Sequence, residues 1–140
     1  MDQLKLENQL CFPFYSVSRL IIRRYKPLLD ELGITYPQYL VLLVLWENDR
    51  QPVNDIAKKL YLQTNTITPL LQRLEVMNIV QRKKSEKDER KVMVSLTSKG
   101  IKLKEKAAEI PFRLMNGVEM SVQELTELRD QLHRMINILS

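Results

Sequence analysis

The only cysteine of the chain, Cys11, is accompanied by tyrosines at helical spacing. Tyr15 follows it by four residues, so the two side chains share one face of a helix. Tyr25 lies fourteen residues after Cys11, on approximately the same face but about 21 Å farther along the helix axis. Tyr25 can therefore meet the sulfur only from an antiparallel neighbouring helix, as in a dimer where position 25 of one chain meets position 11 of the other.

A cysteine with tyrosine neighbours could react with peroxides. Phenol hydroxyls that donate hydrogen bonds to sulfur stabilise the thiolate, which is the form that attacks peroxides. A sulfenic acid at Cys11 has no resolving thiol in its own chain. It would react with a low-molecular-weight thiol, cyclise onto a backbone nitrogen or be oxidised further. The alternative is an unreactive core residue, because free cysteine is among the most buried residue types.

Basic residues are concentrated at positions 81–91. This segment holds six basic and three acidic residues, a balance of +3 in a 140-residue chain whose net charge is +5. Apolar residues on both sides predict two strands, at 80–85 and 91–96, joined by a polar loop. A charged hairpin of this kind favours contact with phosphates.

The segment that begins at residues 64–66, whose side chains are favourable N-caps, predicts a helix with one polar face. Its apolar stripe contains Ile67, Leu70, Leu71 and Leu74. Asn65, Thr68 and Gln72 lie on the opposite face, with Arg73 beside them. Because amide side chains pair with adenine in the major groove and arginine binds guanine or phosphate, this face indicates nucleic-acid binding.

Helical periodicity also surrounds these two segments. Residues 6–32 predict one long amphipathic helix that ends at Gly33. We expect kinks at Pro13 and Pro27, because proline has no amide hydrogen to donate. A capping box at residues 35–38 opens a second, very apolar helix.

The remaining helices complete a recognisable order. Pro52 can begin a short helix, which forms a helix-turn-helix with the helix that starts at residue 64. Thr97 can cap a further helix that Pro111 stops, and a capping box at 121–124 opens the last one. Two helices followed by a charged hairpin are the order of a winged helix-turn-helix.

Composition excludes several classes of function. No apolar run is long enough to span a bilayer, one cysteine cannot form a disulfide framework, and the first residues do not resemble a signal peptide. We therefore expect a cytoplasmic protein with no membrane partner. His133 is the only histidine, and neither a set of metal ligands nor a Ser-His-Asp triad can be assembled around it. We expect no metal, no cofactor and no enzymatic activity.

Four segments resemble the MarR (multiple antibiotic resistance regulator) family and, within it, the one-cysteine organic hydroperoxide resistance repressors. They are LENQLCF at 6–12, YKPLL at 25–29, TYPQYLVLLVLWE at 35–47 and KDERKVMVSLT at 87–97. The resemblance spans essentially the whole chain. It implies a homodimeric repressor that binds an inverted-repeat operator in double-stranded DNA and releases it when an organic hydroperoxide oxidises Cys11.

The resemblance also implies individual roles. Cys11 would be hydrogen-bonded by Tyr25 and Tyr36 of the other subunit, with Tyr15 lining the same pocket. The helix from Thr64 to Asn78 would read the major groove, and the wing tip would enter the minor groove. The implied DNA-binding residues are Thr64, Asn65, Thr66, Thr68, Gln72, Arg73, Lys84, Asp88 and Arg90, with Asp88 holding Arg90.

We therefore predict a mostly α-helical fold with a small β-hairpin wing, in which a winged helix-turn-helix core is flanked by N- and C-terminal dimerisation helices. The expected parts are an N-terminal dimerisation and sensor helix at 1–34, a DNA-binding region at 35–97 and C-terminal dimerisation helices at 98–140. The wing occupies about residues 80–97, and together the parts form one compact domain. The flanking helices are too apolar to stand alone, so a second chain is expected to cover them.

Three features depart from the family pattern. Gln63-Thr64-Asn65 and Gln72 stand where the family usually has Asp-Ser-Gly and a lysine, which predicts a different operator preference and weaker phosphate binding. Pro13 stands near Cys11, where an ordinary helix former is common. No resolving cysteine is present near the C-terminal helices.

Three other functions stay open on the sequence. A regulator could respond to a bound aromatic ligand, with Cys11 inert; Cys11→Ser would then respond like the wild type. A one-cysteine thiol peroxidase would turn over peroxide repeatedly with a small thiol. A non-specific nucleic-acid-binding protein would show a steep salt dependence and no preference for an operator.

Overall fold

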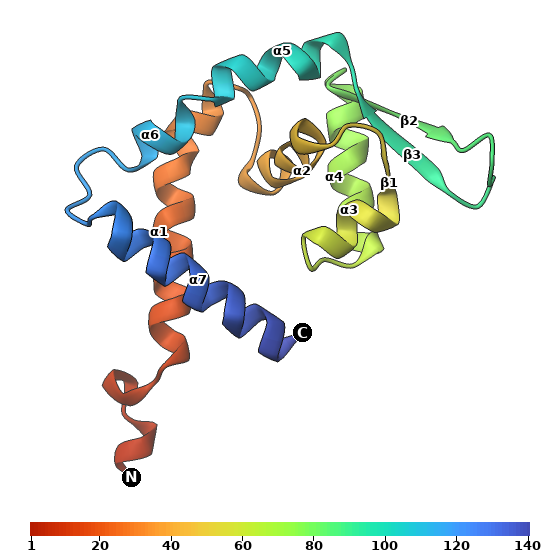
Figure 1. Cartoon of the computed structure of the whole chain (residues 1–140). Coiled ribbons are helices and arrows are strands. Elements are labelled where there is room, and N and C mark those ends of the chain that lie inside the picture. Colours follow the sequence, from red (N-terminus) through yellow and green to blue (C-terminus); the bar gives the residue numbers. More distant parts are fainter.

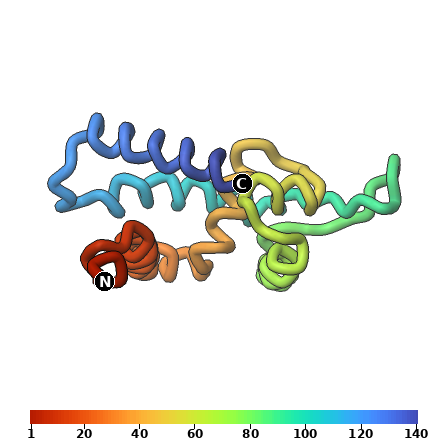
Figure 2. Tube along the Cα trace, turned by 90° about the horizontal axis from the view of Figure 1, so that it is seen from below, coloured from red at the N-terminus to blue at the C-terminus, as the bar shows by residue number.

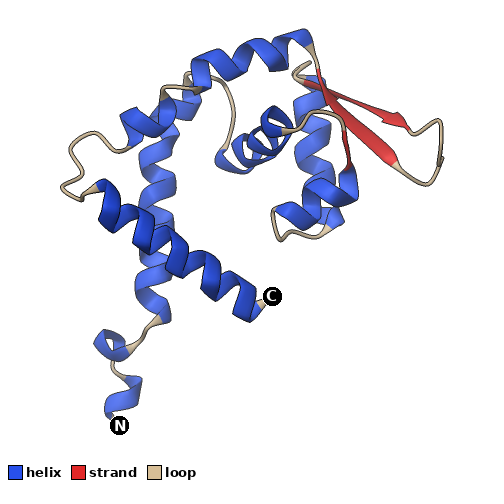
Figure 3. Cartoon of the chain, in the orientation of Figure 1, coloured by secondary structure: helices blue, strands red, loops and turns tan.

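Helices make up most of the structure, and a small sheet lies at one end of it (Figures 1 and 3). The computed structural model describes residues 1–140. In chain order the helical elements are the 3-10 turns η1 (Asp2–Leu4) and η2 (Leu6–Asn8) and the helices α1 (Cys11–Asp30), α2 (Tyr36–Glu47), α3 (Val53–Lys59), α4 (Thr64–Val76), α5 (Ser98–Ala107), α6 (Ile110–Leu114) and α7 (Val122–Leu139). The strands are β1 (Gln51–Pro52), β2 (Val80–Lys84) and β3 (Val92–Leu96). The predicted fold class is confirmed.

The first helix is shorter than its apolar spacing predicts. Two 3-10 turns precede α1, which begins at Cys11, so the expectation of one continuous helix from residue 6 is wrong. Pro13 therefore lies in the first turn of α1 rather than inside a helix, and the expected kink there is also wrong. An amide in the first turn has no acceptor within the helix, so proline is tolerated at that position. Gly33 follows α1 with a φ of 72°, as expected for a residue just beyond a helix end.

The core is built around α2. Leu42 and Leu45 of this helix are fully buried, as are Ile56 of α3, Leu71 of α4 and Val94 of β3. One cluster of buried apolar side chains joins these elements to α1 and α5. The two DNA-binding helices of the prediction, α3 and α4, are thereby fixed to the helix that carries Tyr36.

The helix-turn-helix formed by α3 and α4 differs from the prediction in how it is capped. Gln63 occupies the N-cap position of α4, so the expectation that residues 64–66 supply the cap is wrong. The Thr64 hydroxyl instead donates a hydrogen bond of 3.1 Å to the side-chain oxygen of Asn54 in α3. This bond takes the hydroxyl away from its own helix and joins the two helices at their turn.

The sheet is antiparallel, with the strand order β1-β3-β2. β2 and β3 pair from Val80 opposite Leu96 to Lys84 opposite Val92, which confirms the predicted hairpin. β1 contains only two residues, too few for the alternation that reveals a strand in a sequence. The hairpin forms a wing that projects at the end opposite the α6–α7 loop (Figures 1 and 2).

The C-terminal helices extend from the base of the wing. Thr97 caps α5 by accepting a hydrogen bond from the Gly100 amide, and a capping box opens α7, both as predicted. Pro111 does not simply stop a helix, because it lies in the first turn of the short helix α6. None of the helices is long and apolar enough to cross a membrane.

Two helices leave apolar side chains uncovered in the single chain. No residue of α7 is buried, although Leu128, Leu132 and Ile136 follow one another at four-residue spacing along one face. α1 exposes a larger set: Phe12, Phe14, Val17, Leu20, Ile21 and Ile22. α6 holds α1 through the Glu31–Arg113 ion pair, with N–O distances of 2.7 and 3.0 Å.

Candidate redox and DNA-binding sites

A cluster of tyrosines lies where α1 meets α2. Tyr36 is the first residue of α2, and the predicted capping box fixes its backbone: Thr35 accepts from the Gln38 amide, and the Gln38 side chain accepts from the Thr35 amide. The ring of Tyr36 lies 4.8 Å from the ring of Tyr25, measured between centroids. Tyr39 completes the cluster at 5.7 Å from Tyr25 and 6.3 Å from Tyr36.

Burial disfavours ionisation of these hydroxyls. It raises the pKa of Tyr25 to about 12, with a further contribution from the neighbouring Tyr36 and Tyr39. Burial also raises the pKa of Tyr36 and of Tyr39. A phenol is already protonated at physiological pH at its usual pKa of about 10, and burial widens this margin, so each hydroxyl keeps a hydrogen to donate.

Cys11 and Tyr15 lie apart from this cluster. Cys11 is the first residue of α1 and is exposed. Tyr15 is also exposed, and the Arg19 guanidinium lies 5.4 Å from the centre of its ring. The structure thus brings Tyr25 and Tyr36 together, while Cys11 lies about 21 Å along α1 from the level of Tyr25. Within one chain Cys11 does not reach the tyrosine pair, so the predicted site needs a second chain.

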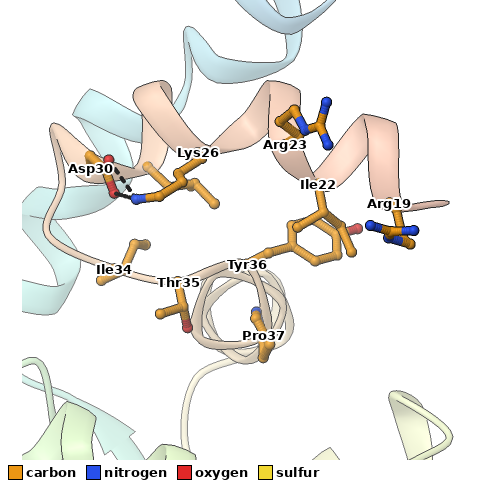
Figure 4. Close-up of a pocket in the computed structure, with 10 residues that line it drawn as sticks. Arg19, Ile22, Arg23, Lys26, Asp30, Ile34, Thr35, Tyr36 and Pro37 are labelled. Atoms are coloured by element: carbon orange, nitrogen blue, oxygen red, sulfur yellow. Dashed lines mark hydrogen bonds and ion pairs between the residues drawn. The ribbon is translucent and has the colours of Figure 1, made fainter. Parts of the chain in front are cut away.

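A cavity of about 490 Å³ opens beside Tyr36, between α1 and the start of α2. Figure 4 shows that Tyr36 lies against Ile22 of α1 and that its hydroxyl end points toward Arg19. Arg23 lies farther along the same helix, and Lys26 pairs with Asp30 at 3.0 Å. The cavity therefore combines apolar walls with cationic groups, and its arginines were not found by sequence reasoning.

The predicted reading face of α4 is open. Thr64, Asn65 and Thr66 are exposed in its first turn, and Gln72 and Arg73 are exposed two turns later. Thr68 is half-buried, and its hydroxyl donates to the Thr64 carbonyl at 2.9 Å. The opposite side of α4 is buried through Ile67, Leu71 and Leu74. This confirms the polar and apolar faces of the helix, although Leu70 is only partly buried.

The wing presents an arginine at its tip. Arg90 is 91% exposed, and its Nε lies 3.1 Å from Asp88 Oδ1, which also accepts the Arg90 backbone amide at 3.1 Å. These hydrogen bonds from Arg90 hold the pKa of Asp88 below its usual value, so the carboxylate stays charged. Lys84 is exposed on β2. Asp88 thus orients Arg90, in the arrangement that the family resemblance implies.

A helix-turn-helix with a buried core, an open polar face on its second helix and a basic hairpin define a winged-helix DNA-binding protein. Residues 23–107 match the family described as transcriptional regulator SarA/Rot. The chain belongs to this family of transcriptional regulators.

Known proteins align with nearly the whole chain. The chain is 47% identical over 138 residues to the organic hydroperoxide resistance transcriptional regulator of Bacillus subtilis strain 168, an alignment that covers 99% of this chain and 94% of the relative. This confirms the resemblance to that branch of regulators. Two solved structures are also similar: AbfR of Staphylococcus epidermidis bound to DNA in reduced form (TM-score 0.85; 99% and 95% of the two chains) and in overoxidised form (TM-score 0.80; 99% and 98%), both 37% identical to this chain.

Sequence reasoning missed parts of both sites. Tyr39 was not among the predicted residues, although it follows Tyr36 by three positions on the same helix. The ion pair between Glu75 of α4 and Arg82 of β2 was also missed. No local sequence pattern predicts this ion pair, because it depends on how the wing packs against α4.

Proposed function

We propose that this protein is a homodimeric transcriptional repressor that senses organic hydroperoxides through Cys11 and then releases its operator. The observation that carries the proposal is the Tyr25–Tyr36 pair, whose ring centroids lie 4.8 Å apart where α1 meets α2. In the proposed dimer, Cys11 of the second chain meets this pair. The name of the Bacillus subtilis relative supports the choice of oxidant. We propose a regulator rather than an enzyme, acting on DNA in the cytoplasm.

The uncovered apolar faces of α1 and α7 support the dimer. Burying apolar surface contributes about 25 cal/mol per Å², so a second copy that covers both faces stabilises each chain. In this arrangement residues 1–34 and 98–140 hold the dimer together, and residues 35–97 bind DNA. A two-fold symmetric dimer presents two α4 helices, which suits an inverted-repeat operator in double-stranded DNA.

The sensing step follows from the chemistry of a thiolate. The Cys11 sulfur attacks the terminal oxygen of the hydroperoxide, the O–O bond breaks, and the alkoxide takes up a proton and leaves as an alcohol. The sulfur becomes a sulfenic acid. Tyr25 and Tyr36 of the partner subunit donate hydrogen bonds to the thiolate before reaction, and Tyr15 lines the pocket. A low-molecular-weight thiol can then condense with the sulfenic acid, releasing water and forming a mixed disulfide.

DNA binding uses two elements. In α4, Asn65 and Gln72 face the base edges of the major groove, and Arg73 binds guanine or phosphate. The hydroxyls of the first turns, Thr64, Thr66 and Thr68, contact the backbone or bases. On the wing, Lys84 contacts phosphate and Arg90, oriented by Asp88, enters the minor groove.

The test is an operator-binding measurement on the reduced protein and its own upstream DNA, with and without an organic hydroperoxide and a small thiol. Cys11→Ser serves as the matched variant. Peroxide should release the wild type from the operator and leave Cys11→Ser bound. The reduced protein should bind random DNA only weakly. Release of both proteins would contradict the assignment of Cys11, and equal affinity for random DNA would contradict operator recognition.

A second candidate function is favoured by the cavity beside Tyr36. Its volume of about 490 Å³ and its arginines suit a small aromatic acid, which would make the protein a ligand-responsive regulator with an inert Cys11. In that case the acid should weaken operator binding equally in the wild type and in Cys11→Ser. A thiol peroxidase would instead consume many equivalents of hydroperoxide per protein with a small thiol as reductant.

A further inference from the structure

The last turn of α4 is joined to the first strand of the wing by one residue pair. Glu75 Oε1 lies 3.1 Å from Arg82 Nη2, and Glu75 Oε2 accepts the backbone amide of Arg82 at 3.1 Å. Both oxygens of one carboxylate are thus committed to a single residue of β2. Because one of the two bonds goes to the backbone, Glu75 holds the strand itself and not only a mobile side chain.

Other bonds hold the same junction from its far side. Asn78, which connects α4 to β2, adopts a left-handed conformation with a φ of 59°. The Asn78 carbonyl accepts a hydrogen bond of 2.7 Å from the Thr97 hydroxyl, and the Lys99 ammonium donates one of 2.9 Å to the Met77 carbonyl. The turn is therefore fixed at the base of β3 and α5. On the side facing α4, the amides of Asn78 and Ile79 donate to the carbonyls of Glu75 and Leu74, each at 2.9 Å. The Glu75–Arg82 pair adds the side-chain contact that continues this attachment into β2.

Arg82 differs from the other basic residues of the wing. Its side chain is only 23% exposed and its Nε is buried, whereas Lys83, Lys84 and Arg90 are exposed. The Arg82 side chain also lowers the pKa of Glu75, so the carboxylate stays charged. Arg82 is consequently bound to the protein rather than available for a phosphate.

We infer that Glu75 and Arg82 are positioning residues that set the angle between α4 and the wing, so that Arg90 reaches the minor groove while α4 lies in the major groove. The inference rests on the proposed function, because it requires both elements to read one duplex. The minor groove is only about 6 Å wide, so the wing tip has little tolerance for misplacement. Arg90 belongs to the loop that joins β2 to β3. This loop is the projecting end of the hairpin (Figure 2), where a small rotation at Arg82 produces the largest displacement.

A double-mutant cycle on operator affinity tests this role. Glu75→Gln keeps the size of the side chain and removes its charge. We expect it to weaken operator binding on the order of tenfold, the range found for directly coupled residues. In an Arg90→Ala background the same substitution should cost less than about twofold, because the contact that it positions is already absent. An equal loss in both backgrounds would overturn the inference, since a general structural defect acts with or without Arg90.

Two further variants complete the experiment. Glu31→Gln breaks another glutamate–arginine ion pair, Glu31–Arg113, which joins the end of α1 to α6 and includes no residue of α4 or the wing. It should leave operator affinity within about twofold. If Glu75→Gln does not fold, as judged by its thermal unfolding, Arg82→Lys replaces it in the cycle. If Arg90→Ala itself leaves operator binding unchanged, the proposed role of the wing fails. If Arg90→Ala weakens binding and the cycle is additive, only the positioning role fails.

Discussion

Tyr25 and Tyr36 lie with their ring centroids 4.8 Å apart and their planes tilted by 41°. Tyr25 is near the end of α1 and Tyr36 begins α2, so the short turn between these helices brings the rings together. Because packing already fixes the two rings, the hydroxyls of Tyr25 and Tyr36 lose little conformational entropy when they donate hydrogen bonds to a thiolate. In the proposed dimer, this pair is the site that receives Cys11 of the second chain.

Removing one hydroxyl of the pair should slow sensing without abolishing repression. A hydrogen bond to a charged group contributes about 1.5–3 kcal/mol, so Tyr36→Phe should slow peroxide-driven release of operator by roughly tenfold or more. Operator affinity of the reduced protein should stay within about twofold, because the ring and its packing remain. The measurement is the rate of DNA release after addition of an organic hydroperoxide, followed by fluorescence anisotropy.

Tyr61→Phe is the control for that substitution, since Tyr61 is exposed in the turn between α3 and α4 and lies outside the tyrosine cluster. It should leave the release rate unchanged. Equal rates for wild type and Tyr36→Phe would show that the hydroxyl does not act on Cys11.

Alkaline pH should destabilise the fold through the tyrosine cluster. Burial raises the pKa of Tyr25 from 10.0 to about 12, so the folded state disfavours the phenolate. The stabilisation is fully present below pH 10 and is lost as the pH rises toward 12, because the unfolded chain ionises first. In Tyr25→Phe the free energy of unfolding should therefore decrease less steeply with pH over this range than in the wild type. Denaturant titration at several pH values measures this. An unchanged slope would assign the alkaline transition to other groups.

The sequence predicts most of the fold because many of its signals are local. The capping boxes at 35–38 and 121–124 each need only four residues, and both are present. The start of α1 could not be placed, because Leu6 and Leu10 continue the apolar spacing although Leu6 lies in a 3-10 turn and Leu10 is exposed. β1 was not predicted from the sequence, because its pairing with β3 is a tertiary contact.

The candidate sites were predicted less completely. The basic loop and the polar face of α4 are visible as charge and periodicity, and the structure exposes both. The pairing of Tyr25 with Tyr36 was implied by resemblance, since no spacing rule connects residues on two different helices. The role of Cys11 stays a prediction, because its expected partners belong to a second chain.

Gln72→Lys should strengthen DNA binding and make it more sensitive to salt. Gln72 is exposed on the reading face of α4, at a position where a cation could reach a phosphate. One added phosphate contact steepens the slope of log affinity against log salt by about 0.9. The slope is measured from operator affinity at four salt concentrations. The exposed Lys102 on α5 offers a comparison, since Lys102→Gln should leave the slope unchanged if that helix does not touch DNA. An unchanged slope for Gln72→Lys would mean that the side chain at position 72 does not reach a DNA phosphate.

Gly100→Ala should destabilise the base of the wing. Gly100 is in the first turn of α5, where an added Cβ would lie 2.3 Å from the carbonyl oxygen of Ile79 and 3.1 Å from Leu96. The Gly100 carbonyl also accepts the Trp46 indole N–H at 2.9 Å, so α5 cannot move away without breaking that bond. Overpacking of this kind costs about 1–3 kcal/mol, which outweighs the better helix propensity of alanine, about 1 kcal/mol. Thermal unfolding should show the loss, and the fluorescence of Trp46, the only tryptophan, should report a change at the same place. Ser98→Ala on the exposed side of the same turn should be nearly neutral. Wild-type stability of Gly100→Ala would mean that Ile79, just before β2, packs less tightly against α5 than this geometry requires.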